Sequence, residues 1–148
     1  MEIKKLQKAD LEGLLRLYRH LHLDDKHLEF EKASEIWAQS AKNDAISYWG
    51  LFLKSTLVSS CQLVQVPNLT RGGRAYCLIE NVVTHPEYRN RGYGKTLLTS
   101  VLDHAWSQGC YKAMLMTGRS EESVLEFYGS VGFNGGEKQA FIAKPSNI

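Results

Sequence analysis

Apolar side chains recur every three or four residues in four segments of the chain, and this spacing predicts four amphipathic helices. The four segments are residues 11–21, 27–41, 93–106 and 120–133. Asp10 stands where a helix N-cap is expected before the first segment, and Gly109 stands where the third helix is expected to end. The pattern therefore divides the chain into helices and the segments that separate them.

The remaining apolar segments have the shorter period of β-strands. The turn-forming stretches KST and PNLTRGGR separate the central strands, which predicts a meander. The expected strands are residues 2–6, 45–54, 57–66, 75–84 and 111–117, with a final strand near Gln139 to Ala143. The expected fold class is α/β, with a mixed, mostly antiparallel central sheet flanked by about four helices.

Length and composition limit the number of domains and the class of partner. A chain of 148 residues has the size of one ordinary domain, so we expect a single domain over residues 1–148. The 18 basic and 16 acidic residues are dispersed and give a formal net charge of +2, which argues against a nucleic-acid groove or a membrane-surface helix. No segment has the length and apolarity expected of a secretion signal or a membrane span.

The cysteines and histidines do not indicate a metal site or a disulfide framework. Cys61, Cys77 and Cys110 lie far apart and form no CxxC pair, so a reducing, cytoplasmic location is expected. Residues 20–25 contain two histidines and two aspartates, but the HxH spacing directs the two imidazoles apart. We therefore expect no bound metal.

RNRGYGK, residues 89–95, lies between a strongly apolar strand and an amphipathic helix. At such a position, the free N–H groups of the first helical turn and the helix dipole attract an anion. Gly92 and Gly94 leave the backbone open to close approach, and Arg89, Arg91 and Lys95 add full charges. These residues predict a diphosphate site, with a solvated glycine turn as the alternative. The spacing of the glycines fits neither a Walker loop nor a dinucleotide-binding fingerprint.

The stretch VVTHPEYRNRGYGKTLL resembles the acyl-CoA-binding signature of the GNAT acetyltransferase superfamily. In that family the loop reads Gln or Arg, two variable residues, Gly, one variable residue, and Gly or Ala. Arg89, Gly92 and Gly94 satisfy this pattern. FYGSVGF, about thirty residues further on, resembles a second motif of the family. Two motifs in the family's order are more specific than either motif alone, and together they cover roughly residues 76–133.

The resemblance implies the acyl-CoA N-acyltransferase fold and acetyl-CoA as the co-substrate. The pantetheine amides are expected to pair with a strand edge at Val82, Val83 and Thr84, and the N–H of Val82 or Val83 can stabilise the oxyanion. Direct attack needs no covalent enzyme intermediate, because holding the amine beside the thioester supplies much of the acceleration. The loop residues expected to hold the diphosphate are Arg89, Asn90, Arg91, Gly92, Tyr93, Gly94 and Lys95.

Two side chains are predicted to move protons. Glu80 is a lone carboxylate in an apolar strand, where burial is expected to disfavour its charged form, and it is the candidate general base. The alternative for Glu80 is a structural carboxylate paired with a buried Arg or a hydroxyl. Tyr128 matches the family tyrosine that points at the CoA sulfur and is the candidate general acid. The alternative for Tyr128 is an amphipathic core tyrosine.

The sequence departs from the family pattern ahead of this tyrosine. Many members carry an Asn that contacts the cofactor seven residues earlier, and here the residue is Glu121, preceded by TGRS. A carboxylate is a poor phosphate partner. Contact of Arg119 with the cofactor and a helix that only packs against it are both left open.

The expected activity is transfer of an acetyl group from acetyl-CoA to a primary amine, by direct attack in a ternary complex. A small-molecule acceptor is favoured, because the chain leaves little spare length for a protein-docking surface. The alternatives are a non-catalytic acyl-CoA sensor or partner-binding module, and an acetyltransferase acting on a protein amine. Nucleic acid and membrane are not expected partners, and a homodimer is left open.

Overall fold

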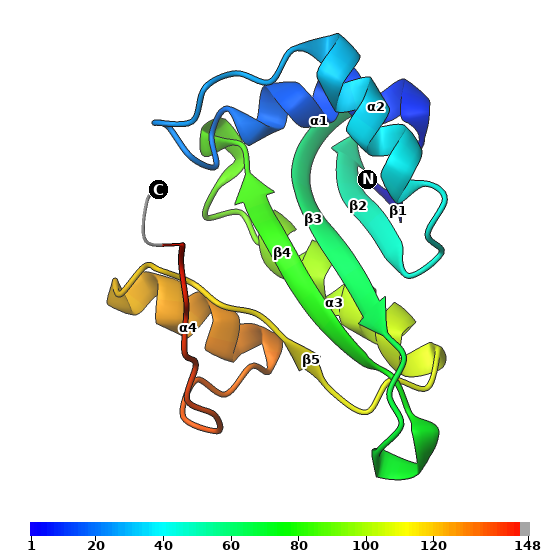
Figure 1. Cartoon of the computed structure of the whole chain (residues 1–148). Helices are drawn as coiled ribbons and strands as arrows, with labels where there is room; N and C mark the ends of the chain where they lie inside the picture. Colours follow the sequence, from blue (N-terminus) through cyan, green and yellow to red (C-terminus); the bar gives the residue numbers. More distant parts are fainter. Residues whose placement is uncertain (146–148) are drawn as a thin grey trace. The chain divides into compact units, whose positions relative to one another are not determined.

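The computed structural model describes residues 1–145, which form a five-stranded sheet and four α-helices (Figure 1). The strands β1 to β5 span Glu2–Lys5, Ile46–Leu53, Thr56–Val66, Tyr76–Thr84 and Ala113–Met114. The helices α1 to α4 span Leu11–Tyr18, Phe30–Ser40, Tyr93–Ser107 and Glu122–Val131. The 3-10 segments η1 to η3 span Lys8–Asp10, Arg71–Gly73 and Pro86–Tyr88. The chain divides into two compact units, Met1–Leu115 and Met116–Ile148, and the single domain expected over residues 1–148 stays a prediction.

The sheet lies within the first unit, with its strands in the order β1-β2-β3-β4-β5. The first three neighbouring pairs are antiparallel. β4 and β5 are parallel, with Cys77 opposite Ala113 and Leu78 opposite Met114. Short connections suffice for the hairpins, whereas α3 provides the crossover that a parallel pair needs. The expected mixed, mostly antiparallel sheet with four helices is confirmed.

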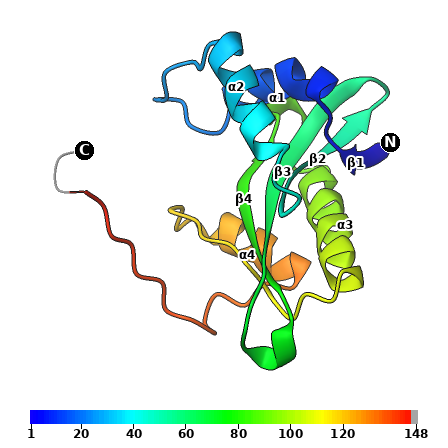
Figure 2. The same ribbon diagram turned by 45° about the vertical axis from the view of Figure 1, so that its right-hand side comes forward.

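The two faces of the sheet carry different helices. Trp49 of β2 contacts His104 of α3, with ring centroids 4.8 Å apart. The adjacent Tyr48 stacks on Trp37 of α2, with ring centroids 4.9 Å apart. Successive strand residues point to opposite faces, so α3 packs on one face and α2 on the other. Figure 2 shows α3 on one side of the strands and α1 with α2 on the other.

The inner face of α3 is completely buried. Leu97, Leu98, Val101 and Ala105 are all 0% exposed, and α3 contacts β2, β3 and β4. Full burial of a leucine or valine side chain contributes about 1.5–3 kcal/mol. This packing fixes the axis of α3, and thereby fixes the helix N-terminus that follows the glycine loop.

Both N-terminal helices are shorter than the apolar spacing predicts. α1 ends at Tyr18 rather than Leu21, and α2 begins at Phe30 rather than His27. Leu23, between the two helices, is 84% exposed, so this connection adds little to the core. No helix within residues 1–145 has the length and apolarity needed to cross a bilayer.

Asp10 precedes α1, as expected, but its side chain does not cap the helix. Its carboxylate instead accepts the Gln7 N–H at 2.8 Å and pairs with the Lys4 ammonium at 3.2 Å. Asp10 therefore closes the η1 turn rather than the first turn of α1.

The C-terminal unit consists of α4 and the segments on either side of it. α4 ends where Gly132 adopts a φ of 107°, the left-handed conformation typical of a helix C-terminus. The strand expected near Gln139 to Ala143 does not form in the described chain. β5 likewise covers only two of the seven residues expected at 111–117. A strand needs main-chain partners along its length, and neither segment has a full set within residues 1–145.

Candidate functional site

The glycine loop leads from β4 through η3 into the first turn of α3. Gly92 is the N-cap of α3 with a φ of 81°, and Asn90 has a φ of 59°. Glycine adopts this left-handed region without strain. No side chain among the described residues caps the helix at Gly92. The N–H groups from Tyr93 to Lys95, which lack acceptors within the helix, therefore have no capping side chain and can meet an anion.

The three cations of the loop differ in what they contact. The Arg89 Nε–H donates to the Thr84 carbonyl at 2.9 Å, which braces the turn against the end of β4. The Arg91 guanidinium lies 5.7 Å from the centroid of the Tyr88 ring. Arg91 and Lys95 are exposed beside the uncapped helix turn. The loop thus combines one cation that fixes its shape with two that face solvent.

A β-bulge interrupts the pairing of β3 and β4 shortly before the loop. Gln62 lies opposite Glu80 and Ser60 lies opposite Val83, so two residues of β4 face one residue of β3. Asn81 lies within the bulge, with a φ of 53°. Asparagine tolerates this region better than most residues, but a non-glycine residue there still costs about 1–3 kcal/mol. Such strained positions concentrate at functional sites.

Hydrogen bonds at the two ends of β4 fix the direction of its main-chain groups. The Cys77 N–H donates to the Lys112 carbonyl, beside β5, at 2.9 Å. The His85 N–H donates to the Val58 carbonyl of β3, also at 2.9 Å. Main-chain groups alternate between the two edges of a regular strand, so without a bulge these two odd-numbered residues would face the same edge. The extra residue of the bulge shifts this alternation by one, so Cys77 faces the β5 edge and His85 faces the β3 edge.

Because of this shift, the three residues predicted to bind the pantetheine arm do not all face the same edge of β4. Val82 and Thr84 direct their main-chain groups away from β3, whereas Val83 directs its own groups toward β3. β5 pairs with β4 only at Cys77 and Leu78, so the edge at Val82 and Thr84 lies beyond that ladder. The Val83 N–H therefore faces β3 rather than this open edge. The assignments of Val82, Val83 and Thr84 to the pantetheine arm, and of Val82 or Val83 to the oxyanion, stay predictions.

Glu80 lies on the sheet face that carries α1 and α2. It is directly opposite Gln62, which in turn is opposite Tyr48. The Asn81 Nδ2–H donates to Gln62 Oε1 at 3.2 Å, which adds an amide pair beside the carboxylate. Glu80 is exposed, so the burial expected for it is not found. No ion pair of Glu80 is found within residues 1–145, and its role as a base stays a prediction.

Two hydroxyl groups on this face are shielded from solvent and have no hydrogen-bond partner among the described residues. They are Tyr18 Oη on α1 and Ser60 Oγ on β3. Burial, and then the neighbouring Tyr48 and Cys61, raise the pKa of the Tyr18 phenol, while the nearby Ser60 and Asn81 act in the opposite direction. Tyr18 lies within the apolar segment 11–21 that predicts the first helix, whereas no sequence pattern indicated Ser60 or Asn81. The position of Asn81 within an otherwise apolar strand could have indicated this cluster of polar side chains.

Tyr128 belongs to the C-terminal unit, where it lies on α4. Its half-buried ring makes edge contacts with Phe127 and Phe133, with centroids 5.0 and 6.2 Å away. Arg119 and Glu121, ahead of α4, are both exposed. The motif FYGSVGF therefore forms a local aromatic cluster, and the general-acid role of Tyr128 stays a prediction.

The thiols are poorly placed for nucleophilic chemistry. Cys61, Cys77 and Cys110 are all buried and free. Burial raises the pKa of the Cys61 and Cys77 thiols to about 12, so both are protonated at neutral pH. Cys77 Sγ lies 3.1 Å from Cys110 Sγ. Within residues 1–145, no three His, Cys, Asp or Glu side chains gather in a way that could hold a metal ion.

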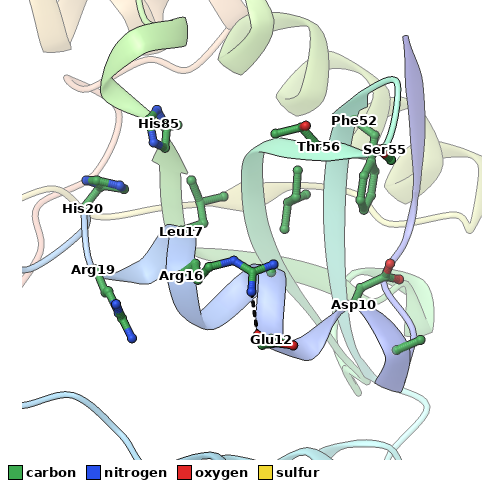
Figure 3. A pocket seen from close by; sticks show the side chains of 13 residues that line it. Asp10, Glu12, Arg16, Leu17, Arg19, His20, Phe52, Ser55, Thr56 and His85 are labelled. Atoms are coloured by element: carbon green, nitrogen blue, oxygen red, sulfur yellow. Dashed lines mark hydrogen bonds and ion pairs between the residues drawn. The ribbon is translucent and has the colours of Figure 1, made fainter.

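A groove of about 620 Å³ lies between α1 and the turn that joins β2 to β3 (Figure 3). Arg16 pairs with Glu12 on its rim at 2.7 Å. The His20 ring contacts the His85 ring, with centroids 4.5 Å apart. The pKa of His20 is lowered, first by burial and then by His85 and Arg89. None of the predicted catalytic or cofactor-binding residues lines this groove.

Comparison with known proteins agrees with the geometry of the loop and strand. Residues 11–133 match the family described as Acetyltransferase (GNAT). The chain is 33% identical over 139 residues to glucosamine 6-phosphate N-acetyltransferase of Trypanosoma brucei brucei, covering 94% of this chain and 92% of that protein. A solved structure from Agrobacterium tumefaciens, named as an acetyltransferase, is 35% identical with a TM-score of 0.92, covering 97% of this chain and 100% of that one. Glucosamine-6-phosphate N-acetyltransferase from Arabidopsis thaliana is 20% identical with a TM-score of 0.82, covering 99% and 98%, and shares the fold.

Proposed function

Because the chain belongs to the GNAT acetyltransferase family, we propose that it transfers the acetyl group of acetyl-CoA to a primary amine of a small molecule. The amine nitrogen attacks the thioester carbonyl, a C–N bond forms, and the C–S bond breaks to release CoA. The observation that carries the proposal is the uncapped N-terminus of α3, fixed by the core and preceded by the open edge of β4.

The diphosphate of acetyl-CoA binds at the first turn of α3. Its oxygens accept hydrogen bonds from the N–H groups of Tyr93, Gly94 and Lys95, where the helix dipole also favours negative charge. The exposed Arg91 and Lys95 side chains add charge-assisted contacts. Arg89 holds the turn in shape through the Thr84 carbonyl, so its contribution is partly structural.

The pantetheine arm lies along the open edge of β4. Its amides pair with the main chain at Val82 and Thr84, the two residues that face away from β3. This pairing brings the thioester to the bulge, where the Val82 N–H stabilises the oxyanion that forms on attack. The strained Asn81 conformation supports this arrangement, because it is what turns Val82 toward the edge.

Two proton transfers complete the reaction. The incoming ammonium loses a proton to the Glu80 carboxylate, which lies next to the bulge on the face of α1 and α2. The departing thiolate, the conjugate base of a thiol with a pKa of about 8.5, takes a proton from the Tyr128 hydroxyl. The second proton, which the nitrogen loses as the amide forms, restores the phenol. The match of FYGSVGF to the family motif supports the second assignment.

The first acceptor to test is an amino sugar phosphate. The relative from Trypanosoma brucei brucei is named for glucosamine 6-phosphate, and it aligns with this chain over almost the full length of both. The face around Glu80 presents neutral hydrogen-bonding groups from Tyr48, Gln62 and Asn81. Such groups suit an acceptor rich in hydroxyls better than a long apolar amine.

Release of free CoA across a panel of amines tests the proposal. Glucosamine 6-phosphate, glucosamine, polyamines and a lysine peptide are each mixed with acetyl-CoA and the protein. Acceptor-dependent release is expected, fastest with the amino sugars. Thermal stabilisation by CoA without release for any amine would contradict the proposal and favour the non-catalytic sensor.

A further inference from the structure

The turn η3 joins the end of β4 to the glycine loop, and a histidine side chain caps its first residues. Pro86 begins η3 and has no N–H, so the Glu87 N–H is the first donor of the turn. Such a donor has no main-chain acceptor within its own helix. Nδ1 of the His85 ring accepts it instead, at 3.3 Å. His85 therefore takes the place that serine or aspartate has in most helix caps.

Main-chain hydrogen bonds fix His85 at the junction of strand and turn. Its N–H donates to the Val58 carbonyl of β3 at 2.9 Å, and its carbonyl accepts the Tyr88 N–H at 2.9 Å. The N–H of Arg89, the first residue of the glycine loop, donates to the Pro86 carbonyl at 3.2 Å. The conformation of η3 therefore determines the direction in which the glycine loop leaves the sheet.

A second histidine holds the capping ring from the side of α1. His20 lies in the turn after α1, where its N–H donates to the Leu17 carbonyl at 3.0 Å. Its ring meets the His85 ring edge to face, with centroids 4.5 Å apart and an interplanar angle of 71°. Both histidines line the groove of Figure 3, where their side chains lie at the same end. The pair thus connects the end of α1 with the turn before the glycine loop.

The cap requires that Nδ1 of His85 carries no proton. A protonated imidazole has an N–H at both nitrogens and accepts no hydrogen bond, so protonation of His85 removes the cap. Two protonated rings in contact also repel each other. Burial, and then His85 and Arg89, lower the pKa of His20 from its ordinary value of 6.5. The folded arrangement therefore favours neutral His20, and its contact with His85 is stable above that value and weakens as the pH falls.

No carboxylate within residues 1–145 forms an ion pair with either imidazole. The ionisable groups that line the groove or follow His85 on η3 are Asp10, Glu12, Arg16, Arg19, Glu87, Tyr88 and Arg89. Of the carboxylates, Asp10 and Glu12 are paired with other cations, and Glu87 is exposed. The turn between β2 and β3 contributes hydroxyl and apolar side chains. A charge added to the histidine pair is therefore uncompensated by an ion pair and is opposed by Arg89.

We propose that His85 is a positioning residue for acetyl-CoA, because its unprotonated Nδ1 caps η3 and the capped turn holds the glycine loop in the conformation that binds the diphosphate. Contact with His20 keeps the capping ring in place. CoA binding should therefore weaken in acid by more than protonation of CoA itself causes. This inference rests on the proposed diphosphate site at the N-terminus of α3.

Calorimetric titration with CoA at about pH 7.5 compares three variants. His85→Ala should raise the CoA dissociation constant about 3–30-fold, the factor that corresponds to loss of a helix cap. His85→Asn should stay within about 3-fold of the wild type, because an asparagine Oδ1 at an N-cap accepts the same N–H. His27→Ala, exposed between α1 and α2, is the matched control and should bind like the wild type. Equal dissociation constants for His85→Ala and the wild type would overturn the proposal.

The same titrations at about pH 5.5 separate a titrating cap from a merely structural side chain. Between the two pH values, the dissociation constant should rise at least about fivefold more for the wild type than for His85→Asn, because asparagine does not titrate in the range of histidine. Protonation of the ligand affects both proteins equally and cancels in this comparison. Parallel rises for the two proteins would contradict the role of the unprotonated ring.

A measurement without ligand tests the cap independently of the proposed function. Long-range 1H–15N spectra of the imidazoles at about pH 8 should show the His85 proton on Nε2, with Nδ1 free to accept. A proton on Nδ1 would overturn the cap whatever the protein binds. If Nε2 carries the proton but the wild type does not bind CoA, the proposed diphosphate site fails, and the link between cap and cofactor fails with it.

Discussion

The loop at the start of α3 and the tail after α4 differ in how their conformations are determined. In the first region, Asn90 and Gly92 adopt left-handed conformations, and the buried face of α3 holds that helix against the sheet. In the second, no described residue is buried, and the strand-like segment 139–143 has no partner. The conformation of a loop can therefore be fixed within one chain when a packed helix adjoins it. A segment with strand-like composition forms a strand only when another strand supplies its main-chain hydrogen bonds.

The largest expected effect concerns Tyr128, which lies on α4 in the C-terminal unit. Tyr128→Phe should lower kcat by about 10²–10⁴-fold, because the thiolate loses its proton donor, while CoA affinity stays nearly unchanged. Steady-state kinetics and calorimetric titration with CoA measure the two effects. Tyr111→Phe, in the first unit, is the control and should leave kcat unchanged. An unaltered kcat in Tyr128→Phe would remove the acid role from the C-terminal unit.

A pair of glycine variants separates backbone strain from anion binding. Gly92→Asp should raise the CoA dissociation constant by about 10²–10³-fold, since it places a carboxylate against the phosphate. Gly72 has a comparable φ of 70° in η2, and like Gly92 it has no neighbouring atom within 4 Å of an added Cβ. Gly72→Asp should therefore lose similar stability, about 1–2 kcal/mol, without affecting CoA binding. Equal dissociation constants for the two variants would contradict the diphosphate site.

A variant of Glu80 tests whether its exposed carboxylate removes a proton from the acceptor. Glu80→Gln should lower kcat/KM for the amine by about 10–10²-fold near neutral pH, a modest loss because water also reaches this site. The deficit should shrink as pH rises through the pKa of the acceptor amine, because more acceptor is then already deprotonated. Rate profiles between pH 6.5 and 9.5 measure this. Glu87→Gln, exposed in η3, should match the wild type. A profile for Glu80→Gln parallel to that of the wild type would argue against a base.

The smallest expected effect concerns the unpaired hydroxyl under α1. Tyr18→Phe removes a shielded group without a described partner, so stability should stay within about 0.5 kcal/mol or rise. Tyr48→Phe on the same face loses the hydrogen bond between Tyr48 Oη and Ser40 Oγ, at 3.3 Å, and should cost about 0.5–1.5 kcal/mol. Urea unfolding of the two variants compares them. A larger loss in Tyr18→Phe would show that its hydroxyl is paired.

The sequence was sufficient for features that depend on neighbouring residues. The period of α3 and the glycines before it predict both the helix and its exposed N-terminus, because helix periodicity and left-handed turns are local properties. The antiparallel meander follows from short turns between β-rich segments. The motif order likewise predicted the family, which the match over residues 11–133 confirms.

Features that depend on distant contacts could not be predicted in this way. The bulge at Asn81 changes which of Val82 and Val83 faces the open edge, and only the register with β3 reveals it. The exposure of Glu80 depends on how closely the helices cover the sheet, which residue types do not specify. The strand expected at 139–143 had the right composition, but strand formation requires a partner that the described chain does not supply.

The most direct test of the central claim is to follow the N–H resonances of Tyr93, Gly94 and Lys95 by NMR during titration with CoA. A parallel titration with pantetheine, which lacks the diphosphate, is the control. The account predicts large shifts of these three resonances with CoA and small ones with pantetheine. Unchanged resonances at saturating CoA would contradict the assignment of the α3 N-terminus as the diphosphate site.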